Sequence, residues 1–287
     1  TEEIQLVHHF NISELDDLYQ NGEPLSIVMQ GAWLKQNIHQ SALICCHWRQ
    51  MFPKAEIIIS VSTSDFMGFS ADAGEYIDPE AAYDVFKSDS TRKEALKLLF
   101  GAADRVIKAH DDLPLPPIKN DTQSLNNVNL QIQAAKSGLK QVSRKYTLRI
   151  RSDLCFMNKN FINTYKNHLH GARRSYATFT QRILIPEIFT INPLTLYRMP
   201  FHYSDWFHFG LSEDIQSLWK DVRNVSFSDS IYYDNNPFLH DTNVLERKFL
   251  TRLAVEQFIH FPYFKKKFPH LHLDYHNDQR SLYDSLY

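Results

Sequence analysis

The stretch NNVNLQIQAAKSGLKQVSRKYTLRIRSD, residues 126–153, decides the fold of this chain. Its first half, Asn129–Val142, spaces its apolar side chains so that they form one stripe along a helix. Its second half, Tyr146–Asp153, alternates Tyr, Leu and Ile with Thr and Arg, which is typical of a strand. A helix that leads directly into a strand is one limb of an α/β unit. The strand delivers the carboxylate of Asp153 to the carboxyl edge of the sheet, where ligands bind in open α/β folds.

Two further segments predict strands that join this one in a parallel sheet. Leu25–Gln30 is almost entirely apolar, and Glu56–Val61 is a run of β-branched residues. The intervening Leu34–Met51 reads as a helix that ends before Pro53, so the two strands form a parallel pair with a right-handed crossover. A third strand is expected at Asp104–Ala109.

The remaining segments are expected to alternate between helices, strands and loops. Ser62–Ala102 reads as an insertion above the sheet with helices near Ala81–Phe86 and Arg92–Phe100, and the proline-rich residues 113–124 read as a loop. Beyond the opening stretch we expect a short helix at Lys159–His168, strands at Arg182–Ile191 and from Phe201 towards Gly210, helices at Ser212–Trp219 and Val244–Phe261, and a tail at 263–287.

Four pieces of the chain, in their order and spacing, resemble a known family. The run from an asparagine-rich turn through a helix to Tyr-x-Leu-x-x-Arg-x-Asp is similar to the centre of nucleotide-sugar glycosyltransferases of the GT-A type. Together with Ser26–Gly31, Phe52–Ser60 and Ser204–Gly210 it resembles the WavE-type lipopolysaccharide-synthesis family over roughly residues 25 to 220.

This resemblance implies a fold and a division of labour along the chain. The expected fold is α/β, GT-A-like, with a Rossmann-type, mostly parallel central sheet flanked by helices in a single domain. Residues 25–153 are expected to bind the nucleotide sugar, residues 154–262 the acceptor, and residues 263–287 form a helical or irregular tail.

The resemblance also implies a divalent metal ion, Mn²⁺ or Mg²⁺, on the donor diphosphate, held by Asp153. Such ions need only one or two protein carboxylates when the substrate supplies the other oxygens. GT-A enzymes usually carry Asp-x-Asp at this position, whereas this chain has Arg151-Ser152-Asp153. The alternative is that Asp153 caps the turn that follows the strand.

Several residues at strand ends and on the central helix are candidates for binding the nucleotide sugar. The resemblance assigns the base and ribose to the end of the first strand, and arginine forks suit a diphosphate. The candidates are Gln30, Gly31, Asp111, Asn127, Gln131, Arg149, Arg151 and Ser152. The alternatives are ordinary turn roles, helix capping by Asn126 or Asn127, and pairing of the arginines with neighbouring acids.

Three acids are candidates for the general base that removes the proton from the acceptor hydroxyl. Glu213 and Asp214 follow a glycine at a predicted helix start, a position that inverting GT-A enzymes place near the acceptor. Acids in a first helical turn also complement the helix dipole, so a structural role is open. Asp205 is the third candidate, and Trp206 beside it could stack on a sugar.

Composition limits the classes of partner. With 31 basic and 33 acidic residues among 287, the net charge of −2 gives no broad nucleic-acid-binding surface. Three cysteines without disulfide or zinc spacing suit a reducing compartment, and the chain shows neither a signal peptide nor an apolar run of about 18 residues. We therefore expect a cytoplasmic protein. Lys265–Lys267 could rest on the inner membrane or form a solvated turn.

These observations favour a glycosyltransferase that moves a sugar from a nucleotide sugar to a bacterial surface glycan, with an inverting course slightly preferred. The acceptor would be a glycan or glycolipid, first lipopolysaccharide or lipooligosaccharide core and then capsule. Two alternatives stay open. One is a non-catalytic nucleotide-sugar-binding or scaffolding subunit of glycan assembly, and the other is a sugar-phosphate transferase or nucleotidyltransferase.

Overall fold

The computed structural model describes residues 12–32, 37–62, 74–110, 112–169 and 176–286. The chain forms two compact units whose boundaries cross the order of the sequence. Unit 1 consists of Thr1–Asp111, Gln133–Leu184 and Phe207–Gln216, and unit 2 consists of Asp112–Ile132, Ile185–Trp206 and Ser217–Tyr287. The predicted single domain with a donor half and an acceptor half stays a prediction.

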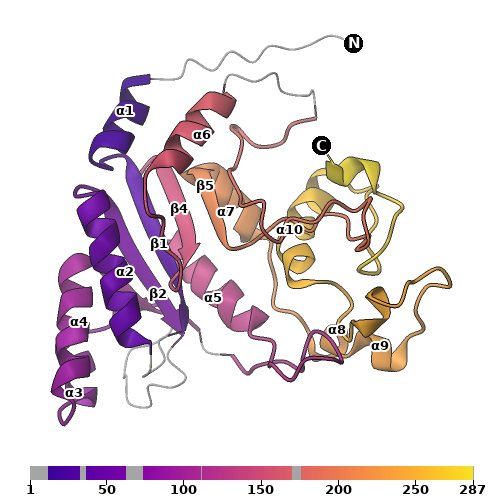
Figure 1. Ribbon diagram of the computed structural model, residues 1–287, viewed down its shortest axis with the longest axis horizontal. Coiled ribbons are helices and arrows are strands. Elements are labelled where there is room, and N and C mark those ends of the chain that lie inside the picture. The colour runs from indigo at the N-terminus through magenta and orange to yellow at the C-terminus, as the bar shows by residue number, and fades with distance from the viewer. Residues whose placement is uncertain (1–11, 33–36, 63–73, 111, 170–175, 287) are drawn as a thin grey trace. The chain divides into compact units, whose positions relative to one another are not determined.

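Unit 1 is built on a five-stranded sheet with the order β3-β2-β1-β4-β5 (Figure 1). Strands β1 to β4 are parallel to one another, whereas β5 runs antiparallel to β4. The strands are β1 Leu25–Ala32, β2 Glu56–Ser62, β3 Arg105–Lys108, β4 Tyr146–Arg151 and β5 Phe207–Leu211. This confirms the predicted mostly parallel, Rossmann-like α/β fold.

One face of the sheet is apolar. Side chains alternate between faces along a strand, and the register places Ile27, Ile59 and Leu148 among the fully or almost fully buried residues of one hydrophobic core. Five helices supply the other half of this core, and Figure 1 shows α2 against the sheet with α4 beside α2. They are α1 Ile12–Gln20, α2 Ile38–Met51, α3 Pro79–Val85, α4 Ser90–Ala102 and α6 Asn160–Leu169.

The opposite face is polar yet buried. It carries Ser26, Gln30, Ser60, Thr147 and Arg149, none of which is more than 2% exposed. Helix α5, Val128–Leu139, covers this face where Gly138 approaches β1 and β2. Polar side chains inside a protein are hydrogen-bonded within it or to a ligand, so polar atoms without a partner on this face would mark a binding site.

Unit 2 holds the short elements after the sheet. They are α8 Phe227–Ser230, α9 Tyr232–Asn235, η1 Glu246–Lys248, α10 Val255–Lys267 and η2 Tyr283–Leu286. Its longest helix, α10, packs with Phe201, Leu253, Leu271 and Leu273 in one apolar cluster. Helix α3 and the remaining helix, α7 Ser212–Lys220, confirm the helices expected near Ala81–Phe86 and at Ser212–Trp219.

Three predicted elements are wrong in kind or in extent. Arg182–Ile191 is not a strand: Leu184 makes one isolated bridge to Phe209, and Phe189 adopts φ 64°, which interrupts an extended chain. The strand expected from Phe201 begins at Phe207, since Phe201 has φ 60°. The last helix starts at Val255 rather than Val244, because Gln257 caps the backbone amide of Ala254 (3.0 Å).

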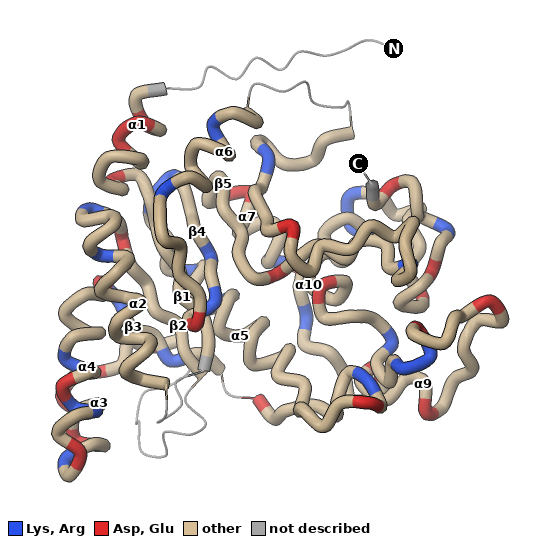
Figure 2. The backbone as a smooth tube through the Cα atoms, in the orientation of Figure 1, with Lys and Arg blue, Asp and Glu red and all other residues tan. Residues whose placement is uncertain are grey.

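Charges of both signs are interspersed through both units (Figure 2). Within the described residues, no helix combines the length and the apolar character needed to cross a membrane. The lysines of the predicted membrane contact end α10, where Lys265 donates to the carbonyls of Pro269 and Leu271 and Lys266 pairs with Asp221. A peripheral membrane contact stays a prediction.

Candidate functional site

The strand order reverses between β1 and β4. From β1 the chain proceeds through α2 to β2 on one side, and it returns through α5 to β4 on the other side. Ligands of open α/β sheets bind outside the carboxyl ends of the two strands at such a switch point. The residues found there are Gln30 and Gly31 at the end of β1, and Arg151, Ser152 and Asp153 at the end of β4. The structure thus brings together five of the predicted site residues.

The two strand ends meet closely at Gly31. Gln30 is the register partner of Arg151, and its carbonyl accepts the amide hydrogen of Ser152 at 2.8 Å. A Cβ atom placed on Gly31 would lie 2.1 Å from Oγ of Ser152. A side chain at position 31 would therefore force Ser152 to shift, so glycine suits this position because of the close approach of the β4 end rather than its backbone angles.

Two buried acceptors lie side by side next to this point. Gln30 is 2% exposed, Ser60 is fully buried, and the register pairs them across β1 and β2. Within the described residues, neither Oε1 of Gln30 nor Oγ of Ser60 has a hydrogen-bond partner. Leaving buried polar groups unsatisfied costs free energy, and such groups concentrate at functional sites.

Arg151 and Asp153 form an ion pair. Nε and Nη2 of Arg151 donate to the two carboxylate oxygens of Asp153 at 3.0 and 2.7 Å, and both side chains are partly exposed. Among the described residues, no group of three or more His, Cys, Asp and Glu side chains gathers as a metal site would. A single carboxylate whose oxygens are both engaged does not by itself make a metal site, so we derive no step through a metal ion.

Arg149 lies deeper than Arg151 on the same strand. It is fully buried and is the register partner of His208, which is also fully buried. A side chain without exposed surface does not contact a ligand at the sheet edge. The predicted role of Arg149 in donor binding stays a prediction, which this burial does not favour.

Asp214 and Glu213 lie at the other edge of the sheet. Because β5 is antiparallel to β4, it ends at the amino edge, where the amide of Ser212 donates to Lys145 (2.9 Å). The carboxylate of Asp214 accepts the amides of Thr180 and Gln181, both at 2.8 Å. Burial raises the pKa of Asp214, and the two amides counteract this in part.

The exposed Glu213 shares this edge. The structure therefore does not bring these two acids together with the switch-point residues, and their catalytic role stays a prediction. The geometry favours a structural role for Asp214.

Helix α5 begins in unit 2, and the predicted site residues at its start make different contacts from one another. Asn126 caps the helix by accepting the amide of Val128 at 3.0 Å, as the capping alternative expected. Asn127 is exposed, and its backbone carbonyl accepts the amide of Gln131 at 3.0 Å. Gln131 donates its side-chain amide to Oδ2 of Asp205. Asp111 lies outside the described residues.

Asp205 is 5% exposed and lies in a polar cluster of unit 2. Beside Gln131, this cluster contains His202 and Glu256, whose Nε2 and Oε2 atoms are 3.2 Å apart. Burial, followed by the negative charge of Asp205, raises the pKa of Glu256 to about 8. Burial lowers the pKa of His202 to about 4. We call Gln131, His202, Asp205 and Glu256 the Asp205 cluster.

A family comparison adds the biological context. The model of the WavE lipopolysaccharide synthesis family matches residues 101–286, more than half of the chain. The chain belongs to this family. Family membership ties it to lipopolysaccharide synthesis. No curated protein matches the chain.

The matched range differs in extent from the predicted resemblance. The family match covers Ser204–Gly210 and residues 126–153, but it begins after Ser26–Gly31 and Phe52–Ser60 and continues far beyond residue 220. For this member of the WavE family, the match therefore includes all of the Asp205 cluster and the end of β4, while the end of β1 lies outside it.

Sequence reasoning missed two members of the Asp205 cluster in this WavE-family chain. His202 is three residues before Asp205, so proximity in the sequence is a signal that could have found it. Glu256 gave no such signal. It lies in the first turn of α10, a helix that the sequence placed from Val244. Only the fold shows that its carboxyl group contacts His202.

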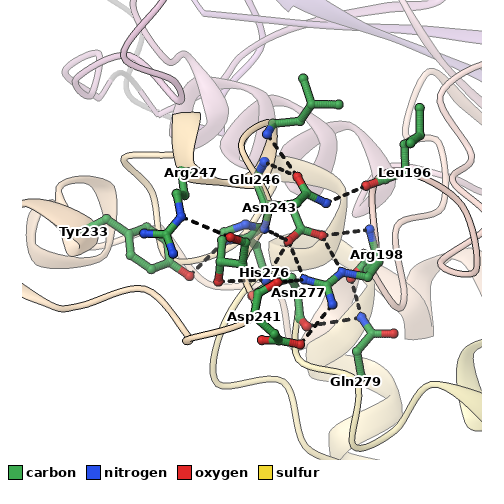
Figure 3. A network of polar contacts seen from close by, with 12 residues as sticks. Leu196, Arg198, Tyr233, Asp241, Asn243, Glu246, Arg247, His276, Asn277 and Gln279 are labelled. Atoms are coloured by element: carbon green, nitrogen blue, oxygen red, sulfur yellow. Dashed lines mark hydrogen bonds and ion pairs between the residues drawn. The ribbon is translucent and has the colours of Figure 1, made fainter.

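A second polar network in unit 2 centres on Glu246 (Figure 3). Its fully buried carboxylate accepts from Arg198 (2.7 and 2.9 Å), from the amide of Asn243 and from Asn277 (both 3.0 Å). Burial by itself would raise the pKa of Glu246, but these donors outweigh it and lower the pKa to about 2. Both carboxylate oxygens of Glu246 are used inside the network, so we interpret it as structural.

Proposed function

We propose that this protein is a glycosyltransferase that transfers a sugar from a nucleotide sugar to a glycan or glycolipid acceptor in bacterial lipopolysaccharide or lipooligosaccharide synthesis, with capsule as the next candidate. Membership of the WavE family supports the part of this proposal that concerns lipopolysaccharide synthesis. The observation that carries the proposal is the switch point between β1 and β4, where Gln30, Gly31 and Arg151 meet. Nucleotides bind at this position in doubly wound sheets.

Donor binding is assigned to unit 1. The Oε1 atom of Gln30 at the end of β1 suits an N–H group of a base, and the partly exposed guanidinium of Arg151 suits the diphosphate. For Arg151 to bind the diphosphate, its ion pair with Asp153 must open or be shared. Arginine is the side chain best matched to phosphate oxygens, since its planar fork makes two parallel hydrogen bonds.

Asp205 is the candidate for the general base that accepts the proton of the acceptor hydroxyl. As the acceptor oxygen bonds to the anomeric carbon, the bond to the diphosphate breaks, the diphosphate leaves with the electron pair, and Asp205 takes the proton. Gln131 donates to Oδ2 and so holds the carboxylate in one orientation, which is what a general base needs in order to meet a hydroxyl.

A non-catalytic donor-binding subunit is the second candidate. It is favoured by the ion pair of Arg151 with Asp153, which engages the carboxylate that a metal-dependent transferase would use. This candidate predicts that a nucleotide sugar binds and is not turned over.

A thermal-shift panel with UDP-, GDP-, CMP- and dTDP-sugars, with and without Mn²⁺, tests donor binding. A ligand at about 100 times its dissociation constant stabilises the folded state by roughly 2.7 kcal/mol. We expect one nucleotide class to raise the melting temperature of the wild type and to do so less for Arg151→Ala. The Mn²⁺ arm, repeated on Asp153→Ala, tests the predicted metal. A panel in which no nucleotide sugar shifts the melting temperature would contradict the donor site.

Replacement of Asp205 tests catalysis. We expect Asp205→Asn to lower kcat about 10²- to 10⁴-fold, the usual contribution of a general base, while the thermal shift by the donor persists. Asp234→Asn is the matched control, because Asp234 is an exposed aspartate in α9 that has no place in the proposed site. Transfer that is equally fast in Asp205→Asn would remove Asp205 from the mechanism, and donor binding without any transfer by the wild type would favour the non-catalytic subunit.

A further inference from the structure

The Asp205 cluster contains an acid that the proposed mechanism does not use. Glu256 projects from the first turn of α10, and its side chain is 16% exposed. It lies 3.2 Å from Nε2 of His202, which is itself almost fully buried. The question is where the proton lies between these two groups.

The partner of Nδ1, the other nitrogen of the imidazole, shows whether Nε2 can donate a hydrogen bond. Nδ1 of His202 is 3.0 Å from the backbone carbonyl of Phe189, and a carbonyl oxygen only accepts. Nδ1 therefore carries a hydrogen, so Nε2 of a neutral His202 has only a lone pair to offer. Two acceptors do not attract each other at 3.2 Å, so a hydrogen must lie between Nε2 and Oε2.

The surroundings decide which group carries this hydrogen. The charged groups that face Glu256 are Asp205, on the preceding segment, and Lys119, whose ammonium lies over the rings of Tyr197 and Phe249 at 5.1 and 4.9 Å. On α10 itself, His260 contacts the backbone carbonyl of Glu256 (2.7 Å) rather than its carboxyl group. Burial disfavours a charged imidazolium and a second carboxylate anion beside Asp205. The hydrogen therefore belongs to Glu256.

The backbone holds His202 in place for this contact. The carbonyl of His202 accepts the amide of Ile191 at 3.0 Å, and the amide of Ser204 donates to Thr190 at 3.0 Å. Among the described residues other than glycine, positive φ angles occur at Phe189 and Phe201, which supply the partner of Nδ1 and the residue before His202. Such conformations cost free energy and concentrate at functional sites.

We propose that Glu256 is a positioning residue that stays a neutral carboxylic acid, donates its hydrogen to Nε2 of His202, and leaves Asp205 as the single carboxylate that receives the proton of a sugar hydroxyl. The part that concerns Asp205 as base rests on the proposed function. Pairs of carboxyl groups held in different protonation states are a usual way to assign acid and base roles in one site. The raised pKa of Glu256 and the lowered pKa of His202 agree with the geometry.

Infrared spectroscopy of the full chain tests the protonation state directly. We expect the wild type at pH 6 to show a carboxylic-acid C=O band that is absent from Glu256→Gln and that disappears with a midpoint near pH 8. In Asp205→Asn the midpoint should fall by about one pH unit or more, because a neighbouring negative charge is removed. Glu80→Gln is the matched control, an exposed glutamate in the first turn of α3, and it should leave the band unchanged.

Denaturant unfolding gives a second readout. Gln at position 256 keeps a donor for His202 but cannot ionise, so the urea midpoint of wild type should fall relative to Glu256→Gln as the pH rises from 5 to 9. If Glu256→Gln does not fold, the band midpoint in Asp205→Asn still decides. Equal spectra of wild type and Glu256→Gln at pH 6 would overturn the inference.

The outcome separates this inference from the proposed function. A carboxylic-acid band in a protein that transfers no sugar would support the protonated Glu256 and contradict the proposed transferase activity. Sugar transfer by a wild type that lacks the band would support the transferase and contradict the protonated Glu256. If both hold, the rate of transfer should fall above pH 8 in the wild type, and this fall should be absent from the pH profile of Glu256→Gln.

Discussion

At the scale of single residues, Gly31 shows how one missing side chain permits the switch point. The end of β4 approaches so closely that a Cβ atom at position 31 would overlap Oγ of Ser152 and would lie 3.2 Å from its Cβ. The hydrogen bond from the amide of Ser152 to Gln30 fixes this approach, so the two strand ends cannot simply separate.

We therefore expect Gly31→Ala to lower the free energy of unfolding by about 1–3 kcal/mol, the usual cost of overpacking. Adding Ser152→Gly removes the opposing atoms and should recover part of this loss. Urea unfolding of the two single variants and the double variant measures the coupling. Additive effects of the two substitutions would show that the overlap is not what makes glycine necessary.

At the scale of elements, α5 can lie on the polar face of the sheet because it presents Gly138 there. A Cβ atom at this position would lie 2.5 Å from Cγ1 of Val28 and 3.0 Å from Cβ of Ser60. Gly101 in α4 provides a contrast, since a Cβ atom there would meet no atom within 4 Å. Both glycines lie inside helices, so their backbone costs are comparable.

Gly138→Ala and Gly101→Ala should therefore change stability in opposite directions. Alanine favours a helix over glycine by up to about 1 kcal/mol, so Gly101→Ala should stabilise the protein by a fraction of this. Gly138→Ala should destabilise it by about 1–3 kcal/mol, because the overlap with β1 and β2 outweighs the helical gain. Thermal and urea unfolding measure both, and stabilisation by Gly138→Ala would mean that α5 packs less closely than described.

At the scale of the whole molecule, stability at low pH depends on the network around Glu246 (Figure 3). This network joins three segments of unit 2 that are far apart in the sequence, represented by Arg198, Asn243 and Asn277. The pKa of Glu246 is lowered to about 2, below the ordinary value of 4.5. The folded state therefore holds the carboxylate ionised at a pH where the unfolded chain is already protonated.

The stabilisation that Glu246 provides is present above pH 4.5 and is lost as the pH falls through about 2. The shift corresponds to roughly 3 kcal/mol. Glu246→Gln should be less stable than wild type at pH 7, and the difference should shrink between pH 4.5 and 2. Urea unfolding at a series of pH values measures it, with the exposed Asp234→Asn as control. A difference that does not vary with pH would contradict the lowered pKa.

The sequence by itself determined the sheet and part of its edge. Apolar and β-branched runs at Leu25–Ala32, Glu56–Ser62 and Tyr146–Arg151 specify strands locally, and residues that end parallel strands necessarily meet at one edge. The residue pattern therefore places Gln30 and Arg151 at one edge of the sheet, and the family resemblance implies their role in a candidate donor site.

The tertiary structure alone decided which acids can act together. Hydrophobic alternation is the same in either direction of a strand, so only the pairing of β5 with β4 shows that Asp214 lies at the amino edge. Glu256 and His202 are more than fifty residues apart, and a proton shared between them depends on the fold that brings Oε2 within 3.2 Å of Nε2. Local pattern specifies elements, whereas protonation depends on neighbours that only folding supplies.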